Sequence, residues 1–457
     1  MDRPTIFLSN FHPFVTKNTL NSGVLDALAS QSKVIILVSK EKEEYFKQIY
    51  EKENIIVEGI NLDPYIKSGK NKIFIRLSEL LLDTNVTRFH QMEACVKDGN
   101  WFKYYFFRAF TRTLSHFLLF KKLVHVLDFK IDNPKPFQNI FEHYKPLAVF
   151  ATDAFGDHDV FLLKNSKSAG IKTIAMVRSW DNTTCRGYLR FVPDKLIVHN
   201  EVMKAEMVKY HDIDIDTINL SGVPQFEKYI GLKASPRDEF FNRIGANPNK
   251  RMILFTPAGQ FFIDSDWQIC QILKELYLEE KIPQDVQFVV RLHPFLPVDL
   301  LSFEPDENFI IDVPGPAKFN KLEKDKKEGE LDTFFFQHIY DSIYHASLVI
   351  NTISSIIIDT AIFDKPLITI NFDGWLKDPP LLRSILKRWR FEENQINWMS
   401  IGSTRLAGSK EELAKWINEY LEHPEIDHDK REIFKQKYCW KYDGKSAERI
   451  ASIVLSN

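Results

Sequence analysis

The clearest pattern of apolar and polar positions covers residues 348–372, where two short apolar runs flank a segment with helical spacing. Residues 348–350 predict a buried strand, and residues 356–363 repeat apolar side chains along one helix face. Asp364-Lys365-Pro366 ends that helix, because the residue before a proline disfavours the α conformation. Residues 367–370 predict a second strand, which the right-handed crossover rule places parallel to the first.

The same alternation of short apolar runs and helical segments continues along most of the chain. Further strands are predicted at residues 5–9, 34–38, 147–152, 172–177, 195–199, 252–256, 286–292 and 309–312. Residues 318–330 contain too few apolar side chains to be buried and predict an exposed, mobile loop. After Trp375 the pattern predicts helices to the end. Alternating strands and helices indicate an α/β protein built on parallel sheets.

The length of the chain indicates two domains, since 457 residues exceed what one hydrophobic core usually serves. We predict a first domain at residues 1–230, with a helical insert at about 71–130. A linker at 231–236 leads to a second domain at 236–425, and a C-terminal helix follows at 426–457.

Three hydroxyl side chains follow the predicted strand 348–350. Thr352, Ser354 and Ser355 lie at the carboxyl end of a strand and at the amino end of a helix. Free backbone N–H groups and the positive helix end suit an anionic diphosphate there, without a metal. The alternative is a plain helix cap, because Ser and Thr are among the commonest caps.

Polar residues also follow other predicted strands. His293 ends strand 286–292, and its imidazole could donate to a phosphate or, when protonated, neutralise charge on a leaving diphosphate; a simple loop histidine is the alternative. Asp153 and Asp157 follow strand 147–152. Ligands of open α/β sheets bind at such strand ends, where a carboxylate can accept a proton from a hydroxyl. Turn formation or capping explains the same two aspartates equally well.

The insert is aromatic and basic. Residues 101–129 hold nine Phe or Tyr, one Trp and the cations Lys103, Arg108, Arg112, Lys121 and Lys122. One interpretation is a surface helix that enters the headgroup region of an anionic membrane. The other is a helical pair whose aromatic face packs on the domain core, and amphipathic spacing alone does not separate the two.

Composition excludes several classes of function. A formal net charge of −2, with 44% hydrophobic and 27% charged residues, argues against a general nucleic-acid binder. Four widely spaced cysteines without metal-ligand spacing indicate reduced thiols in a cytoplasmic protein. No signal peptide and no apolar run long enough to span a membrane is evident. Glycine-rich dinucleotide and P-loop motifs are missing, and Asp-x-Asp recurs too often to indicate a metal site.

Three passages carry a resemblance to a known superfamily: Arg291-Leu292-His293-Pro294, residues 351–370 with their SSIIIDTAIFDKPLI core, and Ser221-Gly222-Val223-Pro224. They resemble the GT-B nucleotide-sugar glycosyltransferases, which have two facing Rossmann-like domains with the donor bound in the C-terminal one. The chain looks closest to enzymes of bacterial surface carbohydrates, including capsule and lipopolysaccharide transferases, sialyltransferases and the CDP-glycerol glycerophosphotransferases of teichoic acid synthesis. Residues 179–187, SWDNTTCRG, are similar to a loop of related polysaccharide enzymes.

The resemblance implies a set of site residues. We expect the donor and its phosphates to contact Arg291, His293, Thr352, Ser354, Ser355, Asp359, Gly259 and Gln260. We expect His12, Ser179, Trp180 and Asn182 on the acceptor side, although Trp180 equally fits a packed aromatic. The catalytic candidates are Asp153, Asp157, Asp181 and His293, because the acidic catalytic motif of the sialyltransferases is not evident.

The resulting hypothesis is a metal-independent glycosyltransferase acting in the cleft between two Rossmann-like domains. It would move a sugar from a UDP, CMP, GDP or CDP donor to a surface polysaccharide or lipid-linked acceptor, with no cofactor besides that donor. The alternatives are glycerophosphate transfer from CDP-glycerol, a UDP-N-acetylglucosamine 2-epimerase-like isomerase, and a catalytically silent scaffold. We expect a cytoplasmic protein that visits the inner face of the cytoplasmic membrane, with membrane binding that is lost when Lys121 and Lys122 become Glu.

Overall fold

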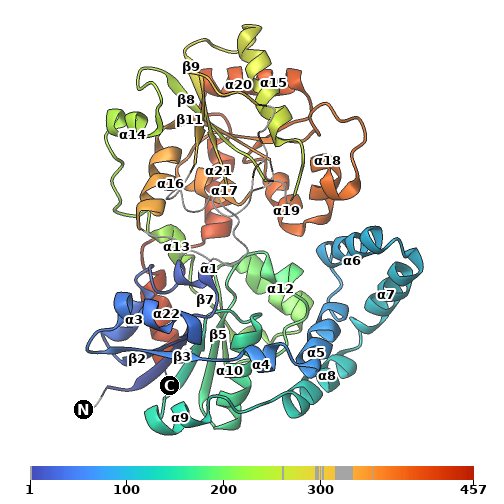
Figure 1. Cartoon of the computed structure of the whole chain (residues 1–457), viewed down its shortest axis with the longest axis vertical. Coiled ribbons are helices and arrows are strands. Elements are labelled where there is room, and N and C mark those ends of the chain that lie inside the picture. Colours follow the sequence, from blue (N-terminus) through green and yellow to red (C-terminus); the bar gives the residue numbers. More distant parts are fainter. Residues whose placement is uncertain are drawn as a thin grey trace. The chain divides into compact units, whose positions relative to one another are not determined.

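The structure is a computed structural model that describes residues 3–259, 262–293, 298, 300, 303–313, 333–352 and 354–456. The chain forms two units, of which one contains residues 1–230 and 437–457 and the other residues 231–436. Each unit is a parallel sheet with helices on both faces (Figure 1). The α/β architecture predicted from the sequence is therefore confirmed. The predicted loop at 318–330 lies outside the described residues.

The first unit contains a seven-stranded sheet in the order β3-β2-β1-β4-β5-β6-β7. Its strands are β1 Thr5–Ser9, β2 Lys33–Ser39, β3 Ile55–Ile60, β4 Ala148–Ala151, β5 Lys172–Met176, β6 Lys195–Val198 and β7 Ile218–Leu220. All neighbouring strands pair in parallel. The strand order reverses between β1 and β4, and ligands of open α/β sheets bind beyond the carboxyl ends of the strands at such a point.

Helices cover both faces of this sheet because apolar side chains point alternately to either side of each strand. Ile6 and Leu8 pack with α2 (Val24–Ala29) and with the C-terminal helix α22 (Ser446–Leu455), which lies among the first elements of the chain in Figure 1. Phe7 packs on the opposite face with Phe137 and Phe141. The helices of this unit are α1 Pro13–Thr16, α2 Val24–Ala29, α3 Glu43–Tyr50, α4 Asp63–Ile66, α5 Gly69–Leu80, α6 Asn85–Asp98, α7 Trp101–Leu114, α8 Leu118–Ile131, α9 Gln138–Tyr144, α10 Asp157–Ser168, α11 Asn182–Cys185, α12 Glu201–His211, α13 Pro224–Glu227 and α22 Ser446–Leu455.

The second unit contains a six-stranded parallel sheet in the order β10-β9-β8-β11-β12-β13. Its strands are β8 Arg251–Thr256, β9 Val286–Arg291, β10 Phe309–Asp312, β11 Ala346–Asn351, β12 Leu367–Ile370 and β13 Arg405–Ala407. Its helices are α14 Arg237–Ile244, α15 Asp266–Leu278, α16 Thr333–His345, α17 Ile356–Ile362, α18 Ile385–Arg388, α19 Glu393–Ile401 and α20 Lys410–Glu422, and α21 His428–Cys439 leads back to the first unit. Here the strand order reverses between β8 and β11.

The predicted strand, turn, helix and strand at 348–372 are confirmed as β11, α17 and β12, with β11 and β12 parallel. The prediction that only helices follow Trp375 is wrong, because β13 adds an edge strand beside β12. Ile350 and Ile368 join the apolar core with Leu413 and Ile417 of α20.

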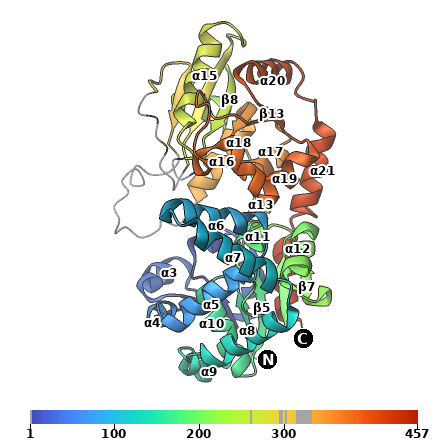
Figure 2. The same ribbon diagram turned by 90° about the vertical axis from the view of Figure 1, so that its right-hand side faces the viewer.

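The insert consists of α5, α6, α7 and α8, which face the viewer in Figure 2. It approaches the loop between β5 and β6 closely, since Tyr188 N donates to Ser78 O at 2.8 Å. A Cβ on the neighbouring Gly187 would lie only 2.8 Å from Ser78 Oγ, and this glycine has a φ of +83°. The close contact and the backbone conformation both favour glycine at this position.

Both earlier interpretations of the insert need correction. Phe102 of α7 is 81% exposed and Leu119 of α8 is 84% exposed, so much of the aromatic and apolar surface is not buried against the sheet. Lys121, in contrast, is buried; its Nζ lies 2.6 Å from Asp212 Oδ2 and 4.6 Å from the centroid of the Tyr188 ring. The prediction that Lys121 flanks a membrane-facing surface is therefore wrong.

Candidate functional site

In the second unit, buried hydroxyl groups gather in the segments after β8 and β11. Thr352 is fully buried, and its Oγ1 has no hydrogen-bond partner among the described residues. The same holds for Ser265 Oγ, just before α15, which the sequence analysis did not single out. Buried hydroxyls normally have partners, so these two are candidates to donate to a ligand at the reversal of the strand order.

The start of α17 presents two more hydroxyl side chains. Ser354 Oγ accepts a hydrogen bond from Ile356 N at 3.3 Å, which is a local turn contact. Ser355 is exposed, and its side chain makes no capping hydrogen bond. The alternative of a plain helix cap therefore does not describe Ser355. Asp359 lies one turn further along α17 and is partly buried, and as an acid it suits a ribose or glycerol hydroxyl better than a phosphate.

The loop after β8 is held by Asp266 at the start of α15. Asp266 Oδ2 accepts from Gly259 N at 2.7 Å, and Oδ1 accepts from Ala258 N at 3.2 Å. Burial raises the pKa of Asp266 to about 6, although these two N–H groups lower it in part. The N–H of Gly259 is therefore engaged, and we expect Gly259 to shape the loop with its φ of +91°. Gln260 lies outside the described residues.

Arg291 and His293 differ in their surroundings. Arg291 is buried at the end of β9, and its Nη1 donates to Ser342 Oγ at 2.8 Å and to His338 O at 3.3 Å in α16. These contacts are typical of a residue that connects a strand to a helix. The side chain of His293 keeps exposed surface, and desolvation of its imidazole lowers its pKa to about 4. His293 is therefore neutral at pH 7 unless an anion lies beside it.

In the first unit, Asp153 follows β4 and is buried. Its Oδ2 accepts from Arg178 Nη1 at 2.8 Å, just beyond β5. Burial raises the pKa of Asp153, while Arg178 and Arg186 lower it in part. A desolvated carboxylate of raised pKa is a better proton acceptor than an exposed one.

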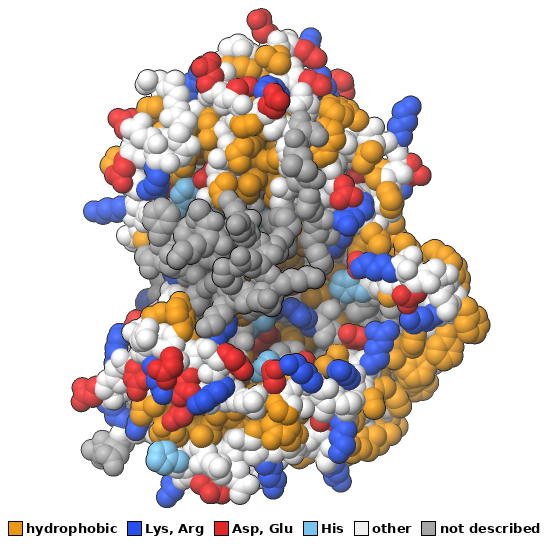
Figure 3. Space-filling model, in the orientation of Figure 1, with side chains coloured by type: hydrophobic (Ala, Val, Ile, Leu, Met, Phe, Trp, Pro, Cys, Tyr) orange, Lys and Arg blue, Asp and Glu red, His pale blue; other side chains and the backbone are white. Residues whose placement is uncertain are grey.

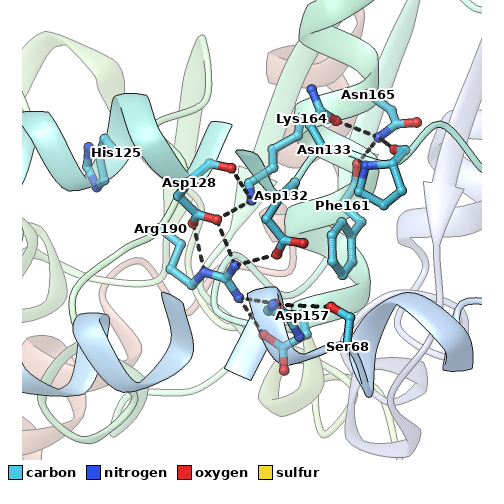
Figure 4. A network of polar contacts seen from close by, with 12 residues as sticks. Ser68, His125, Asp128, Asp132, Asn133, Asp157, Phe161, Lys164, Asn165 and Arg190 are labelled. Carbon is cyan, nitrogen blue, oxygen red and sulfur yellow. Dashed lines mark hydrogen bonds and ion pairs between the residues drawn. The ribbon is translucent and has the colours of Figure 1, made fainter. Parts of the chain in front are cut away.

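Asp157 belongs to a different arrangement, shown in Figure 4. Arg190 Nη1 lies 2.9 Å from Asp157 Oδ1, and the same guanidinium contacts Asp128 of α8 and Asp132, the residue that follows this helix. Lys164 of α10 is fully buried and donates to Asp128 Oδ1 at 2.6 Å. This network joins the insert to the sheet, so Asp157 is better explained as part of that junction than as a base.

The residues expected on the acceptor side lie on the loops after β1 and β5. His12 begins α1 and accepts from Phe14 N through Nδ1; burial and then Arg178 and Arg186 lower its pKa to about 3. Asn182 is buried and accepts from Ser179 N at 3.1 Å, so the loop folds back on itself as α11.

The other two residues of this loop have neighbours of their own. Trp180 packs on the apolar cluster that includes Leu196 and Met203. Asp181 accepts from Cys185 Sγ at 3.6 Å. His12 follows β1 and Asp153 follows the adjacent strand β4, so both lie at the carboxyl ends of central strands. The charge of Arg178 lowers the pKa of each.

Comparisons with known proteins identify the family. The model of the CDP-glycerol:poly(glycerophosphate) glycerophosphotransferase family matches residues 177–456, more than half of the chain. The chain belongs to this family. As a family member it is a transferase that uses a nucleotide-activated donor. No curated protein matches the sequence of this family member.

Solved structures support the GT-B fold of this family member. A UDP-N-acetylglucosamine 2-epimerase from Neisseria meningitidis, bound to UDP-N-acetylglucosamine, is 14% identical, with a TM-score of 0.51 over 99% of this chain and 100% of that chain. A glycosyltransferase from Rickettsia africae is 10% identical, with a TM-score of 0.51 over all of both chains. At such low identity these likenesses show the fold alone. These likenesses confirm the predicted GT-B fold, and the family match confirms the predicted transferase class.

Proposed function

We propose that this family member transfers glycerol phosphate, or a closely related phosphopolyol, from a CDP-linked donor to a hydroxyl of a growing surface polymer. The observation that carries the proposal is the family match over residues 177–456, which includes the whole of the second sheet and its loops. In this reaction the acceptor oxygen attacks the phosphorus that bears the polyol. The bond from that phosphorus to the bridging oxygen breaks, and CMP leaves with the electron pair.

We assign the donor's phosphates to the carboxyl ends of the central strands β8 and β11. Thr352 Oγ1 and Ser265 Oγ offer buried hydroxyls without partners among the described residues, and Ser355 adds an exposed one. The helix end of α17 favours negative charge close by. His293 would gain a proton beside the diphosphate and so partly neutralise it.

We assign the role of general base to Asp153. It is the buried carboxylate held by Arg178 at the reversal point of the first sheet, and it would take the proton of the acceptor hydroxyl. Asp153→Asn should lower kcat by about 100-fold or more while leaving donor affinity near wild type, since a base acts on the acceptor. Full activity of a folded Asp153→Asn variant would refute the assignment, and loss of activity in Asp157→Asn or Asp181→Asn instead would move it there.

Transfer of a sugar is the second candidate function. It is favoured by the fold shared with the Rickettsia africae glycosyltransferase, and with a UDP- or GDP-linked sugar it would release UDP or GDP instead of CMP. Isothermal titration with CDP-glycerol, UDP-sugars, GDP-sugars and CMP-sugars separates the two. We expect binding of the CDP-linked donor; binding of UDP- or GDP-linked sugars alone would favour sugar transfer.

We further propose that the acceptor is lipid-linked and that the insert contacts the inner face of the cytoplasmic membrane. Large apolar side chains of α7 and α8 gather on the outer face of the insert, at the right-hand edge of Figure 3. The large apolar side chains that are exposed on these two helices or between them include Trp101, Phe102, Tyr105, Phe106, Phe117, Leu118, Leu119 and Leu123. Arg112 and Lys122 are exposed on the same two helices. No described helix is long and apolar enough to cross a bilayer.

Sedimentation with vesicles tests this contact. We expect salt-sensitive binding to anionic vesicles, with each exposed cation contributing about 1 kcal/mol near the surface. The double substitution Phe102→Ser/Leu119→Ser should abolish binding, whereas Leu278→Ser, at a 71% exposed leucine of α15, should not. Equal recovery of wild type in the supernatant with anionic, neutral and no vesicles would contradict the proposal.

A further inference from the structure

A second carboxyl group lies beside Asp153, at a position that the sequence analysis did not single out. Asp159 is in the first turn of α10 and is 2% exposed. A Cβ on Gly156 would lie 3.2 Å from Asp159 Oδ2 and also 3.2 Å from Asp153 Oδ2. The two carboxyl groups therefore flank the same glycine, which has no side chain to separate them.

The two groups have unlike partners. Arg178 lies against Asp153, whereas no ion pair reaches Asp159 from the part of the chain that the structure describes. Ser9 Oγ, at the end of β1, donates a hydrogen bond to Asp159 Oδ1. Ser9 in turn accepts from Thr152 N at 2.8 Å, and Thr152 Oγ1 donates to Ser9 O at 2.8 Å. The hydrogen bonds among Ser9, Thr152 and Asp159 thus hold Asp159 at the carboxyl ends of β1 and β4.

Arg178 forms an ion pair with only one of the two buried carboxyl groups, which favours a single negative charge, because neighbouring like charges do not both ionise easily. Burial and then the charge of Asp153 raise the pKa of Asp159 to about 8, although hydrogen bonds from Ser9 and from the backbone N–H groups of Asp153 and Thr152 lower it in part. The other charged groups that act on the pair through Asp153 are Arg178, Arg186 and Asp181, and Asp157 nearby is paired with Arg190.

We propose that Asp153 and Asp159 form an acid pair at the junction of β1 and β4, in which Asp159 holds the proton and Asp153 carries the charge. The inference rests on the proposed role of Asp153 as the base. Asp159 is a positioning residue, since it acts on the acceptor hydroxyl only through the charge of Asp153. While Asp159 is neutral, Asp153 remains ionised against Arg178 and available to an acceptor hydroxyl.

Substitution by the neutral isostere distinguishes the two carboxyl groups. Asp159→Asn should keep most of the wild-type turnover, because Asn reproduces an uncharged acid, whereas Asp153→Asn should lose it. Thermal unfolding adds a readout that packing alone would not change. An acid that keeps its proton in the folded state to pH 8 makes the protein less stable as pH rises from about 4 to 8. Asp159→Asn should remove that contribution to the pH dependence.

Infrared spectroscopy of the wild type, with isotope-labelled aspartate, tests the pair even if a variant does not fold. We expect the band of a buried protonated carboxyl at neutral pH, its loss above about pH 8, and a lower titration midpoint in Asp153→Asn, since a like charge is removed. Absence of that band at neutral pH, or a folded Asp159→Asn as inactive as Asp153→Asn, would overturn the pair. If Asp153→Asn is fully active and the band is present, the role of Asp153 as general base is refuted, while the protonation of Asp159 stands.

Discussion

At the scale of single residues, hydroxyl groups explain how the second unit can hold a diphosphate. Thr352 is fully buried without a partner among the described residues, and Ser355 is exposed beyond a helix end that it does not cap. Both could be predicted from the sequence, because they follow a clear strand. Ser265 and Asp159 could not, because their importance depends on burial and on partners that are distant along the chain.

Removing hydroxyls should weaken donor binding. We expect Thr352→Val and Ser355→Ala each to cost about 1–3 kcal/mol of donor affinity, the value of a hydrogen bond to a charged group. Ser409→Ala serves as the control, because Ser409 caps α20 of the same unit through Glu412 N. It should lower stability and leave calorimetric donor affinity unchanged. Wild-type donor affinity in a folded Thr352→Val/Ser355→Ala variant would exclude the carboxyl ends of β8 and β11 as the phosphate site.

The titration of His293 gives a second residue-scale prediction. Its pKa is lowered to about 4, and a bound diphosphate should raise it. Binding then takes up a proton, so donor affinity should increase as pH falls through the raised pKa of the complex and level off below the free pKa of about 4. His293→Gln should remove this dependence. Calorimetry in buffers of different ionisation enthalpy measures the proton uptake, and equal heats in all buffers at pH 6 would argue against the contact.

At the scale of elements, most of the sheet could be predicted because the central strands are continuous apolar runs. The missed strands lie toward the sheet edges and are weak signals: β3 contains Glu58 and Gly59, and β7 and β13 each have three residues. The ion-pair network that joins the insert to the rest of the first unit could not be predicted, for another reason. Asp128 and Arg190 are far apart in sequence, and a local pattern says nothing about such a contact.

That network should be a main source of stability for the insert. Asp128→Asn leaves Lys164 buried without its carboxylate, so we expect a loss of about 3–5 kcal/mol in the free energy of unfolding. Asp98→Asn is the matched control in the same insert, because Asp98 forms an exposed pair with Lys103. The urea midpoint of Asp98→Asn should be close to that of the wild type, because exposed ion pairs contribute little to stability. Equal midpoints for the two variants would show that the network contributes little.

At the scale of the whole molecule, two Rossmann-like units and the family match agree on a transferase with a nucleotide-activated donor. The sequence motifs were sufficient for this class because they lie in the matched region, at strand ends where ligands bind. They could not choose between sugar and glycerol phosphate, since either donor presents the same diphosphate to the same hydroxyls.

The identity of the released nucleotide tests the central claim most directly. The protein would be incubated with CDP-glycerol or with UDP-linked sugars, with and without a glycerol phosphate oligomer as acceptor, and the nucleotides separated by chromatography. We predict CMP from CDP-glycerol, only when the acceptor is present, and loss of CMP in Asp153→Asn. Release of UDP from a UDP-sugar with no CMP from CDP-glycerol, or conversion of a UDP-sugar without any acceptor, would contradict the account.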